Sequence, residues 1–239
     1  MKSVLSVFYR EYLLLTRGSR YPMTTERKVI NDFIQQLNPG DVFYDIGAFY
    51  GEYSFQASMH GASEIVAFEP HPAIASEFRS RLDEYRNSWL YAGNVDTIDL
   101  HQVALSDSNG AVSLTDEFEN RVCPGILSGN ESGRTTVNVE ATRGDEIIAQ
   151  NQLPLPDILK IDVEGAEMRV LKGLEQTLSD GHCRRIYLEV HPPGSGVTDL
   201  GTFGDDSKSL FELLDRYGFE PSEEFVRLKD RLNVRLDRI

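Results

Sequence analysis

Hydrophobic and polar positions follow a repeating order along the chain, in which a short apolar run precedes a stretch with helical spacing. Apolar runs of roughly 4–8 residues predict buried strands, and the amphipathic stretches predict helices. This alternation is typical of an α/β protein whose mostly parallel sheet is covered by helices on both faces. The expected strands are 41–46, 64–68, 97–105, 158–163 and 185–190, and the expected helices are 51–60, 71–85, 166–178 and 208–217.

Three regions depart from this order. Residues 4–15 and 25–37 have helical spacing ahead of the first strand, so we expect an N-terminal helical cap within 1–40. Residues 112–114 and 136–140 alternate on either side of a Gly-, Ser- and Asn-rich loop, which predicts an inserted hairpin. We expect one domain over 1–239, with a core over 41–192 and a C-terminal helix and sheet edge over 193–239, the edge strand being 233–239.

Glycines and carboxylates follow the first two predicted strands. Gly47 and Gly51 follow the strand that contains Asp45, and Glu69-Pro70 ends the next strand 24 residues after Asp45. Ligands bind at the carboxyl ends of strands in open α/β sheets, and an acid at the position of Glu69 can accept hydrogen bonds from both ribose hydroxyls. The G-x-G-x-x-G spacing of nicotinamide enzymes is absent from this segment, which disfavours an oxidoreductase.

Charged residues also gather at the ends of the two strands expected in the second half of the chain, 158–163 and 185–190. Lys160, Asp162 and Glu164 alternate, so they share one face of the strand end. One face does not bury three charges without partners, which favours a binding crevice, although Lys160 can also simply neutralise Asp162. Glu189 and His191 share a face in the same way, and His191 is either a proton acceptor or an ordinary loop residue.

Together these motifs resemble the FkbM family of S-adenosylmethionine-dependent methyltransferases over residues 41–192. The most specific part is K-I-D-V-E-G-A-E at 160–167, and the loop 45–51 and the F-E-P of 68–70 resemble the family's nucleotide loop and ribose-binding strand end. Phe49 departs from the family, which usually has Asn there. The resemblance implies a Rossmann-like, seven-stranded methyltransferase sheet, S-adenosylmethionine as cofactor, and methyl transfer to oxygen, frequently on a sugar or polyketide.

The resemblance also implies roles for individual residues. Asp162 and Glu164 would lie where the methyl group meets the acceptor, and a hydroxyl acceptor would need Glu164, Asp162 or His191 as its base. The segment that begins at Ala104 would lie near adenine. The residues expected to bind the cofactor are Asp45, Gly47, Ala48, Gly51, Glu69, Pro70, Ala104 and Asp162.

The charge balance narrows the choice of partner. Net charge is −14, and the basic residues comprise 18 Arg and only 6 Lys. A strongly acidic surface repels phosphates, so no nucleic acid partner is expected, and a Lys-poor acidic chain suits a halophilic cytoplasm. With the resemblance, this implies the carboxylate of a hexuronic acid in an N-linked glycan, methylated to an ester. An ionised carboxylate needs cationic recognition rather than a base, for which we expect Arg121, Arg134 and Arg143.

Several alternatives stay open at this stage. The acceptor can be a hydroxyl of a sugar or small molecule, or the chain can be a non-catalytic adaptor of a glycan assembly complex. Mg²⁺ held by Asp162 and Glu164, with Glu189 or His191, is conceivable but not favoured, so no metal ligand is assigned. The two cysteines predict a reducing cytoplasm. The apolar stripe in 4–15 and the basic stretch 227–239 allow peripheral contact with the cytoplasmic membrane face.

Overall fold

The computed structural model describes residues 25–88, 91, 93–116, 135–195, 198–227 and 231–239. The helix expected over 4–15 and most of the loop between the hairpin strands therefore lie outside the described residues. Arg121 and Arg134, two of the three arginines expected to bind the acceptor, also lie outside them.

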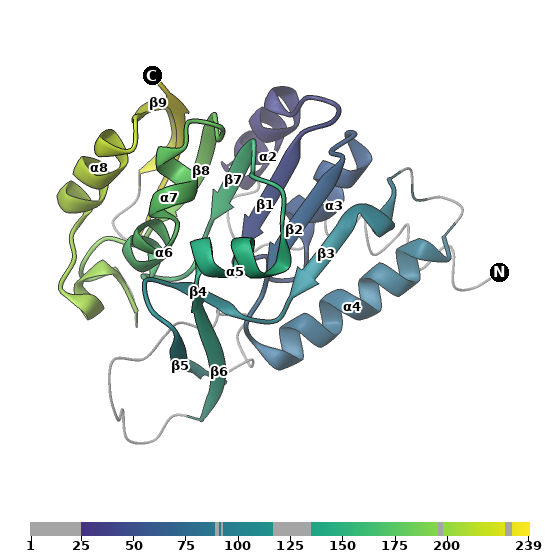
Figure 1. The fold of residues 1–239 in the computed structure, drawn as a ribbon, viewed down its shortest axis with the longest axis horizontal. Helices are drawn as coiled ribbons and strands as arrows, with labels where there is room; N and C mark the ends of the chain where they lie inside the picture. Colours follow the sequence, from purple (N-terminus) through teal and green to yellow (C-terminus); the bar gives the residue numbers. More distant parts are fainter. Residues whose placement is uncertain (1–24, 89–90, 92, 117–134, 196–197, 228–230) are drawn as a thin grey trace.

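A seven-stranded sheet with the order β3-β2-β1-β7-β8-β10-β9 runs through the centre of the molecule (Figure 1). Neighbouring strands are parallel from β3 to β8, whereas β10 is antiparallel to both of its neighbours. This confirms the Rossmann-like, mostly parallel sheet. The strands are β1 (Val42–Ile46), β2 (Glu64–Phe68), β3 (Ile98–His101), β7 (Ile158–Ile161), β8 (Arg185–Val190), β9 (Phe219–Arg227) and β10 (Leu232–Arg238).

Successive side chains of each central strand point to opposite faces of the sheet, and each face is covered by a different layer of helices. Phe43 packs in a buried cluster with residues of one layer, whereas Tyr44 packs with residues of the other. The first layer consists of α2 (Thr25–Gln36), α3 (Glu52–Met59) and α4 (Pro72–Arg86). The second consists of α5 (Gly144–Asn151), α6 (Glu167–Gly173), α7 (Glu175–Ser179) and α8 (Ser207–Arg216). The sheet is therefore buried on both faces.

A second sheet, with the order β4-β6-β5, lies below the central one in Figure 1. Its strands are β4 (Ala104–Ser106), β5 (Gly110–Thr115) and β6 (Thr136–Arg143). The antiparallel pairing of β5 with β6 confirms the predicted hairpin. The single strand expected over 97–105 is wrong, because β3 pairs with β2 and β4 pairs with β6. β3 alternates apolar and polar residues, β4 is mostly apolar, and no Gly or Pro separates them, so the pattern could not show where the chain changes sheets.

Two further expectations are corrected. The helix expected over 166–178 is divided at Leu174 into α6 and α7. The C-terminal strand is not the sheet edge, because β10 lies between β8 and the unpredicted edge strand β9. Pro221 and several acids interrupt the apolar alternation of β9, and proline is tolerated at an edge. Within the described residues, no helix combines the length and apolar character needed to cross a membrane.

Candidate active site

The predicted motifs meet at the carboxyl ends of β1, β2, β7 and β8, at the lower edge of the central sheet in Figure 1. Gly47 follows β1, Glu69 follows β2, Asp162 and Glu164 follow β7, and His191 follows β8. Since β1 lies between β2 and β7, these strand ends are neighbours. The crevice expected from the sequence thus has its residues side by side.

The glycine turn after β1 depends on the absence of two side chains. Gly47 has a φ of 76°, and a Cβ there would lie 1.8 Å from the carbonyl oxygen of Asp162. Gly51 has a φ of 83°, and its Cβ would lie 2.3 Å from the ring of Phe78. The amides of Gly47 and Ala48 both donate to the Phe68 carbonyl. These contacts hold the loop against β2 and β7, so any ligand over the turn would meet backbone.

Asp45 lies beneath this turn rather than at its surface. Its side chain is fully buried, and its Oδ2 accepts hydrogen bonds from the Ser54 amide at 3.1 Å and the Ser54 hydroxyl at 2.7 Å. Lys160 Nζ lies 3.7 Å from Oδ1 of Asp45 and 3.5 Å from Oδ2 of Asp162. Burial raises the pKa of Asp45, and Lys160 opposes that rise. Asp45 therefore joins β1 to α3, and Lys160 bridges it to Asp162.

Glu69 is the carboxylate best placed to hold a ribose. It is 5% exposed, its Oε2 accepts from the Phe49 amide at 2.9 Å, and its Oε1 accepts from the His71 amide at 2.8 Å. Each oxygen keeps a further lone pair for a hydroxyl donor. Burial raises the pKa of Glu69 to about 7 despite these two bonds. This buried, amide-fixed carboxylate fits the ribose of a nucleoside cofactor.

The second half of the site is a cluster of four carboxylates around one imidazole, which we call the acid–histidine cluster. Nδ1 of His191 lies 2.6 Å from Oε1 of Glu167. Nε2 lies 3.3 Å from Oε2 of Glu164 and 3.6 Å from Oε1 of Glu189. One carboxylate oxygen of Asp162, one of Glu164 and a ring nitrogen of His191 all lie within 4.8 Å of one another.

The backbone that carries Glu164 is strained. Glu164 has a φ of 49° and Gly165 a φ of 93°, so two successive residues are left-handed. A Cβ at Gly165 would lie 2.5 Å from the backbone nitrogen of Asp199. A non-glycine residue in this conformation costs about 1–3 kcal/mol and persists only where its surroundings hold it. The turn aims Glu164 back toward His191 instead of continuing the strand.

The cluster shifts the pKa of its own members. Burial alone would lower the pKa of His191, but the bond to Glu167 and the charges of Glu164, Glu167 and Asp162 raise it to about 10. Burial, with the charge of Asp162, raises the pKa of Glu189 to about 7 against the opposing charges of His191 and Arg231. An Nη of Arg231 lies 3.3 Å from Oε1 of Glu189.

The remaining predicted residues lie outside the acid–histidine cluster. Ala104 is buried in the core of the small sheet, in a cluster that includes Ala166. Pro70 follows Glu69 and is half-buried. Arg143 is not brought to the acid–histidine cluster: its guanidinium contacts the Asp107 carbonyl at 3.5 Å and the Asp145 carboxylate at 3.8 Å.

Two members of the site were not predicted as functional. Glu167 is fully buried and fixes His191, and Arg231 pairs with Glu189. Glu167 stands in the K-I-D-V-E-G-A-E stretch, three residues after Glu164, which was the signal available. The alternation of side chains along a strand could not place Glu167, because the chain leaves the strand after β7 and α6 begins at Glu167.

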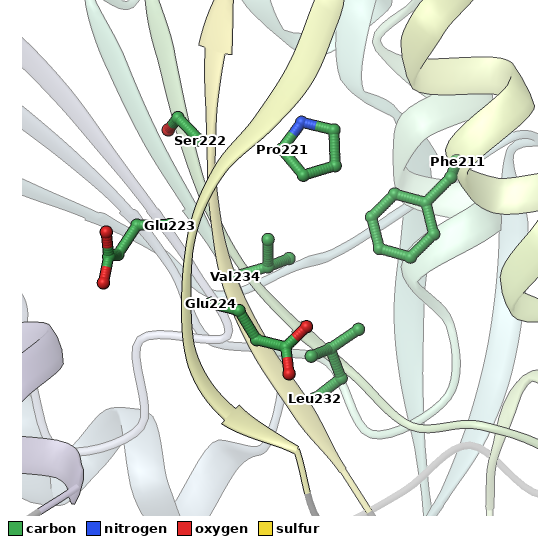
Figure 2. A pocket seen from close by; sticks show the side chains of 7 residues that line it. All are labelled: Phe211, Pro221, Ser222, Glu223, Glu224, Leu232 and Val234. Atoms are coloured by element: carbon green, nitrogen blue, oxygen red, sulfur yellow. The ribbon is translucent and has the colours of Figure 1, made fainter.

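A separate hollow of about 350 Å³ lies between α8 and the β9–β10 hairpin. Figure 2 shows Phe211, Leu232 and Val234 at this hollow, with Glu223 and Glu224 on β9. None of its lining residues belongs to the glycine turn, the strand-end acids or the acid–histidine cluster, so we place the candidate active site at the strand ends and not at this hollow.

Comparison with known proteins identifies the class. The family model described as the methyltransferase FkbM domain matches residues 45–231. The chain belongs to this family of methyltransferases, and the match contains the glycine turn, Glu69 and the acid–histidine cluster. The predicted class of enzyme, a methyltransferase of this family, is thereby confirmed.

Individual relatives are more distant. Hexuronic acid methyltransferase AglP from Haloferax volcanii is 28% identical over 170 residues, covering 70% of this chain and 62% of AglP, under two thirds of that protein. The 31-O-demethyl-FK506 methyltransferase FkbM from Streptomyces tacrolimicus is 28% identical over 185 residues, covering 65% of this chain and 67% of that enzyme. The crystal structure of magnesium protoporphyrin IX methyltransferase from Synechocystis with bound S-adenosylmethionine superposes with a TM-score of 0.51 at 13% identity, covering 98% of this chain and 96% of that one.

Proposed function

We propose that this protein is an S-adenosylmethionine-dependent O-methyltransferase that converts the carboxylate of a hexuronic acid, in a glycan or glycolipid, to its methyl ester. The similarity to AglP supports this acceptor, and the acidic composition is consistent with the same kind of salt-adapted cell. The proposed setting is protein N-glycosylation at the cytoplasmic face of the membrane. The observation that carries the proposal is that the buried Glu69 carboxylate and the acid–histidine cluster lie at the same edge of the sheet, on opposite sides of the turn after β1.

The two halves of the site have different roles, one in binding the cofactor and the other in orienting the acceptor. Glu69 accepts hydrogen bonds from the ribose of the cofactor, while the Gly47 turn presents backbone to it. When bound, S-adenosylmethionine supplies an activated methyl carbon, whose bond to sulfur breaks as the acceptor oxygen attacks. Asp162 and Glu164, which follow β7 on the other side of β1 from Glu69, orient the acceptor. Holding the reacting groups in line supplies about 7–11 kcal/mol of the barrier reduction.

Cationic recognition of the acceptor falls to arginine. Arg231 lies at the rim of the cluster, 3.3 Å from Glu189 and 21% exposed, so its guanidinium can also contact an acceptor carboxylate. Arg121 and Arg134, which lie outside the described residues, stay candidates for the same role. Arg143 is the least favoured of the predicted arginines, because its contacts are to Asp107 and Asp145.

A second candidate function is methylation of a hydroxyl group. Glu164, His191 and Glu167 lie in a line of contacts of 3.3 and 2.6 Å, an arrangement typical of a base that a further acid orients. The similarity to the 31-O-demethyl-FK506 methyltransferase supports this reading. A hydroxyl must lose its proton, whereas a carboxylate is already ionised, so the two acceptors differ in their need for a base.

The test uses methyl-labelled S-adenosylmethionine with two matched glycolipids, one ending in a hexuronic acid and one in the corresponding hexose. We expect label in the first only, released as methanol by mild base, because the product is an ester. Label that resists base and appears with the hexose also would establish the hydroxyl reaction instead. Cofactor binding without transfer to either acceptor would contradict both and favour an adaptor. Glu69→Ala should abolish labelling and serves as the control for the site.

A further inference from the structure

We infer that Asp162, Glu164 and His191 form a binding site for one divalent cation at the carboxyl ends of β7 and β8. The role given to this cation, contact with the acceptor, rests on the proposed function. The site itself rests on the geometry of the acid–histidine cluster. The cation belongs to the class of Mn²⁺ and Mg²⁺, which bind carboxylate oxygens and, for Mn²⁺, an imidazole nitrogen as well.

The donor atoms are close to the spacing that one ion requires. They lie within 4.8 Å of one another, whereas ligand atoms at opposite sides of an ion with bonds of about 2.1 Å are about 4 Å apart. The carboxylates of Asp162 and Glu164 are each 28% exposed, so small side-chain rotations can close the difference. His191 is 9% exposed and supplies the fixed ligand. Glu189, at 3.6 Å from Nε2, is in reach as a fourth ligand.

A buried second carboxylate orients the imidazole. Oε1 of Glu167 contacts Nδ1 of His191 at 2.6 Å and also accepts from the Gly165 amide at 3.0 Å. This directs Nε2 toward Glu164, the arrangement in which a metal-binding histidine is held by a carboxylate from behind. Glu167 is fully buried, and its Oε2 has no hydrogen-bond partner among the described residues. A group of solvated surface acids would not require a buried carboxylate that orients the imidazole ring.

The charge balance also calls for a cation. Asp162, Glu164, Glu167 and Glu189 meet here, while His191 pairs with Glu164 and Glu167, Arg231 pairs with Glu189, and Lys160 is shared between Asp162 and Asp45, so the acids still outnumber the bases. An acidic acceptor entering this site would meet like charges at close range. A divalent ion offsets them, and its remaining coordination positions can hold an acceptor oxygen. The inference thus explains how an acid-rich site can take an acidic acceptor.

The test measures binding of Mn²⁺ to the full chain after chelator treatment, by the electron paramagnetic resonance signal of free Mn²⁺. We expect one ion per chain. Asp162→Asn, Glu164→Gln and His191→Gln should each weaken binding at least tenfold, and Glu167→Gln about 10–100-fold. Glu223→Gln, an acid on β9 at the hollow in Figure 2, should bind as the unchanged chain does. Circular dichroism of each variant confirms that it is folded.

Absence of binding, or binding that the Asp162, Glu164 and His191 substitutions leave unchanged, would overturn the inference. Labelling of the hexuronic glycolipid with and without chelator separates this outcome from failure of the proposed function. Transfer that proceeds unchanged in chelator, with no Mn²⁺ bound, overturns the cation site and leaves the proposed function in place. Mn²⁺ bound at the site without any transfer to the hexuronic acid supports the site and overturns the proposed acceptor.

Discussion

Glu69 couples cofactor binding to pH, because its burial moves its titration into the neutral range. Its pKa is raised to about 7, so the carboxylate that accepts the ribose hydroxyls is ionised above that pH and protonated below it. We expect the dissociation constant of S-adenosylhomocysteine to rise up to tenfold per pH unit as the pH falls below about 7. Calorimetric titration between pH 5.5 and 8.5 measures this.

The matched variant for that experiment is Glu69→Gln. An amide cannot ionise, so its affinity for S-adenosylhomocysteine should be at least tenfold weaker at pH 8 and nearly independent of pH. The amide also places a donor where Glu69 accepts from the amides of Phe49 and His71. An unaltered pH dependence in this variant would assign the titration to another group and contradict the role of Glu69.

Alanine substitutions at two glycines can distinguish the destabilising effect of a steric clash from that of an unfavourable backbone conformation. Gly47 and Gly181 both have positive φ, 76° and 95°, but a Cβ at Gly47 would lie 1.8 Å from the Asp162 carbonyl, whereas at Gly181 it would meet nothing within 4 Å. We expect Gly181→Ala to lower the free energy of unfolding by about 1 kcal/mol, from conformation alone. Gly47→Ala should lower it by about 3 kcal/mol or more. Urea unfolding compares the two, and equal losses would show that the close approach does not matter.

The sequence was informative for these residues to different degrees. Gly47, Glu69, Asp162 and Glu164 could be placed together, because parallel strands end at one edge and ligands bind there. The left-handed backbone at Glu164 could not be predicted, since a glutamate gives no sign of positive φ. It depends on the packing of the following glycine against Asp199.

One carboxylate of helix α2 forms hydrogen bonds with two strands of the sheet, β8 and β10. Asp32 accepts from the hydroxyl of Tyr187 at 2.7 Å and from Arg235 at 2.7 and 2.9 Å. Asp32→Ala leaves the buried Tyr187 hydroxyl and a 15%-exposed guanidinium without this acceptor. We expect a loss of about 3 kcal/mol in the free energy of unfolding. Asn31→Ala, an exposed position on the same helix, should change it by under about 0.5 kcal/mol in the same urea titration.

Elements with a clear pattern of apolar residues could be predicted from the sequence, whereas elements without such a pattern could not. Strands β1, β2, β7 and β8 are short and mostly apolar, so their sequences alone identified them. Strand β9 contains Pro221 and several acids and is held mainly by pairing with β10, a non-local contact that leaves no local pattern. The division between β3 and β4 likewise depends on which strand each piece pairs with.

The whole molecule carries a net charge of −14, and this charge opposes compaction. Repulsion between exposed carboxylates extends over about 10 Å at 0.1 M salt and about 3 Å at 1 M. We therefore expect the thermal unfolding midpoint, followed by circular dichroism, to rise between 0.05 and 2 M KCl. A midpoint that stays constant or falls would contradict both this mechanism and the salt-adapted setting.

High salt also strengthens burial of apolar surface, so the electrostatic part has to be isolated. The triple variant Glu84→Gln, Asp215→Asn, Glu220→Gln removes three exposed negative charges, far from the glycine turn in sequence, and leaves the apolar core unchanged. We expect it to unfold at a higher temperature than the unchanged chain at 0.05 M KCl, and the two midpoints to converge at 2 M. Parallel salt curves, with the same offset at every concentration, would assign the stabilisation to apolar burial and remove self-repulsion as its cause.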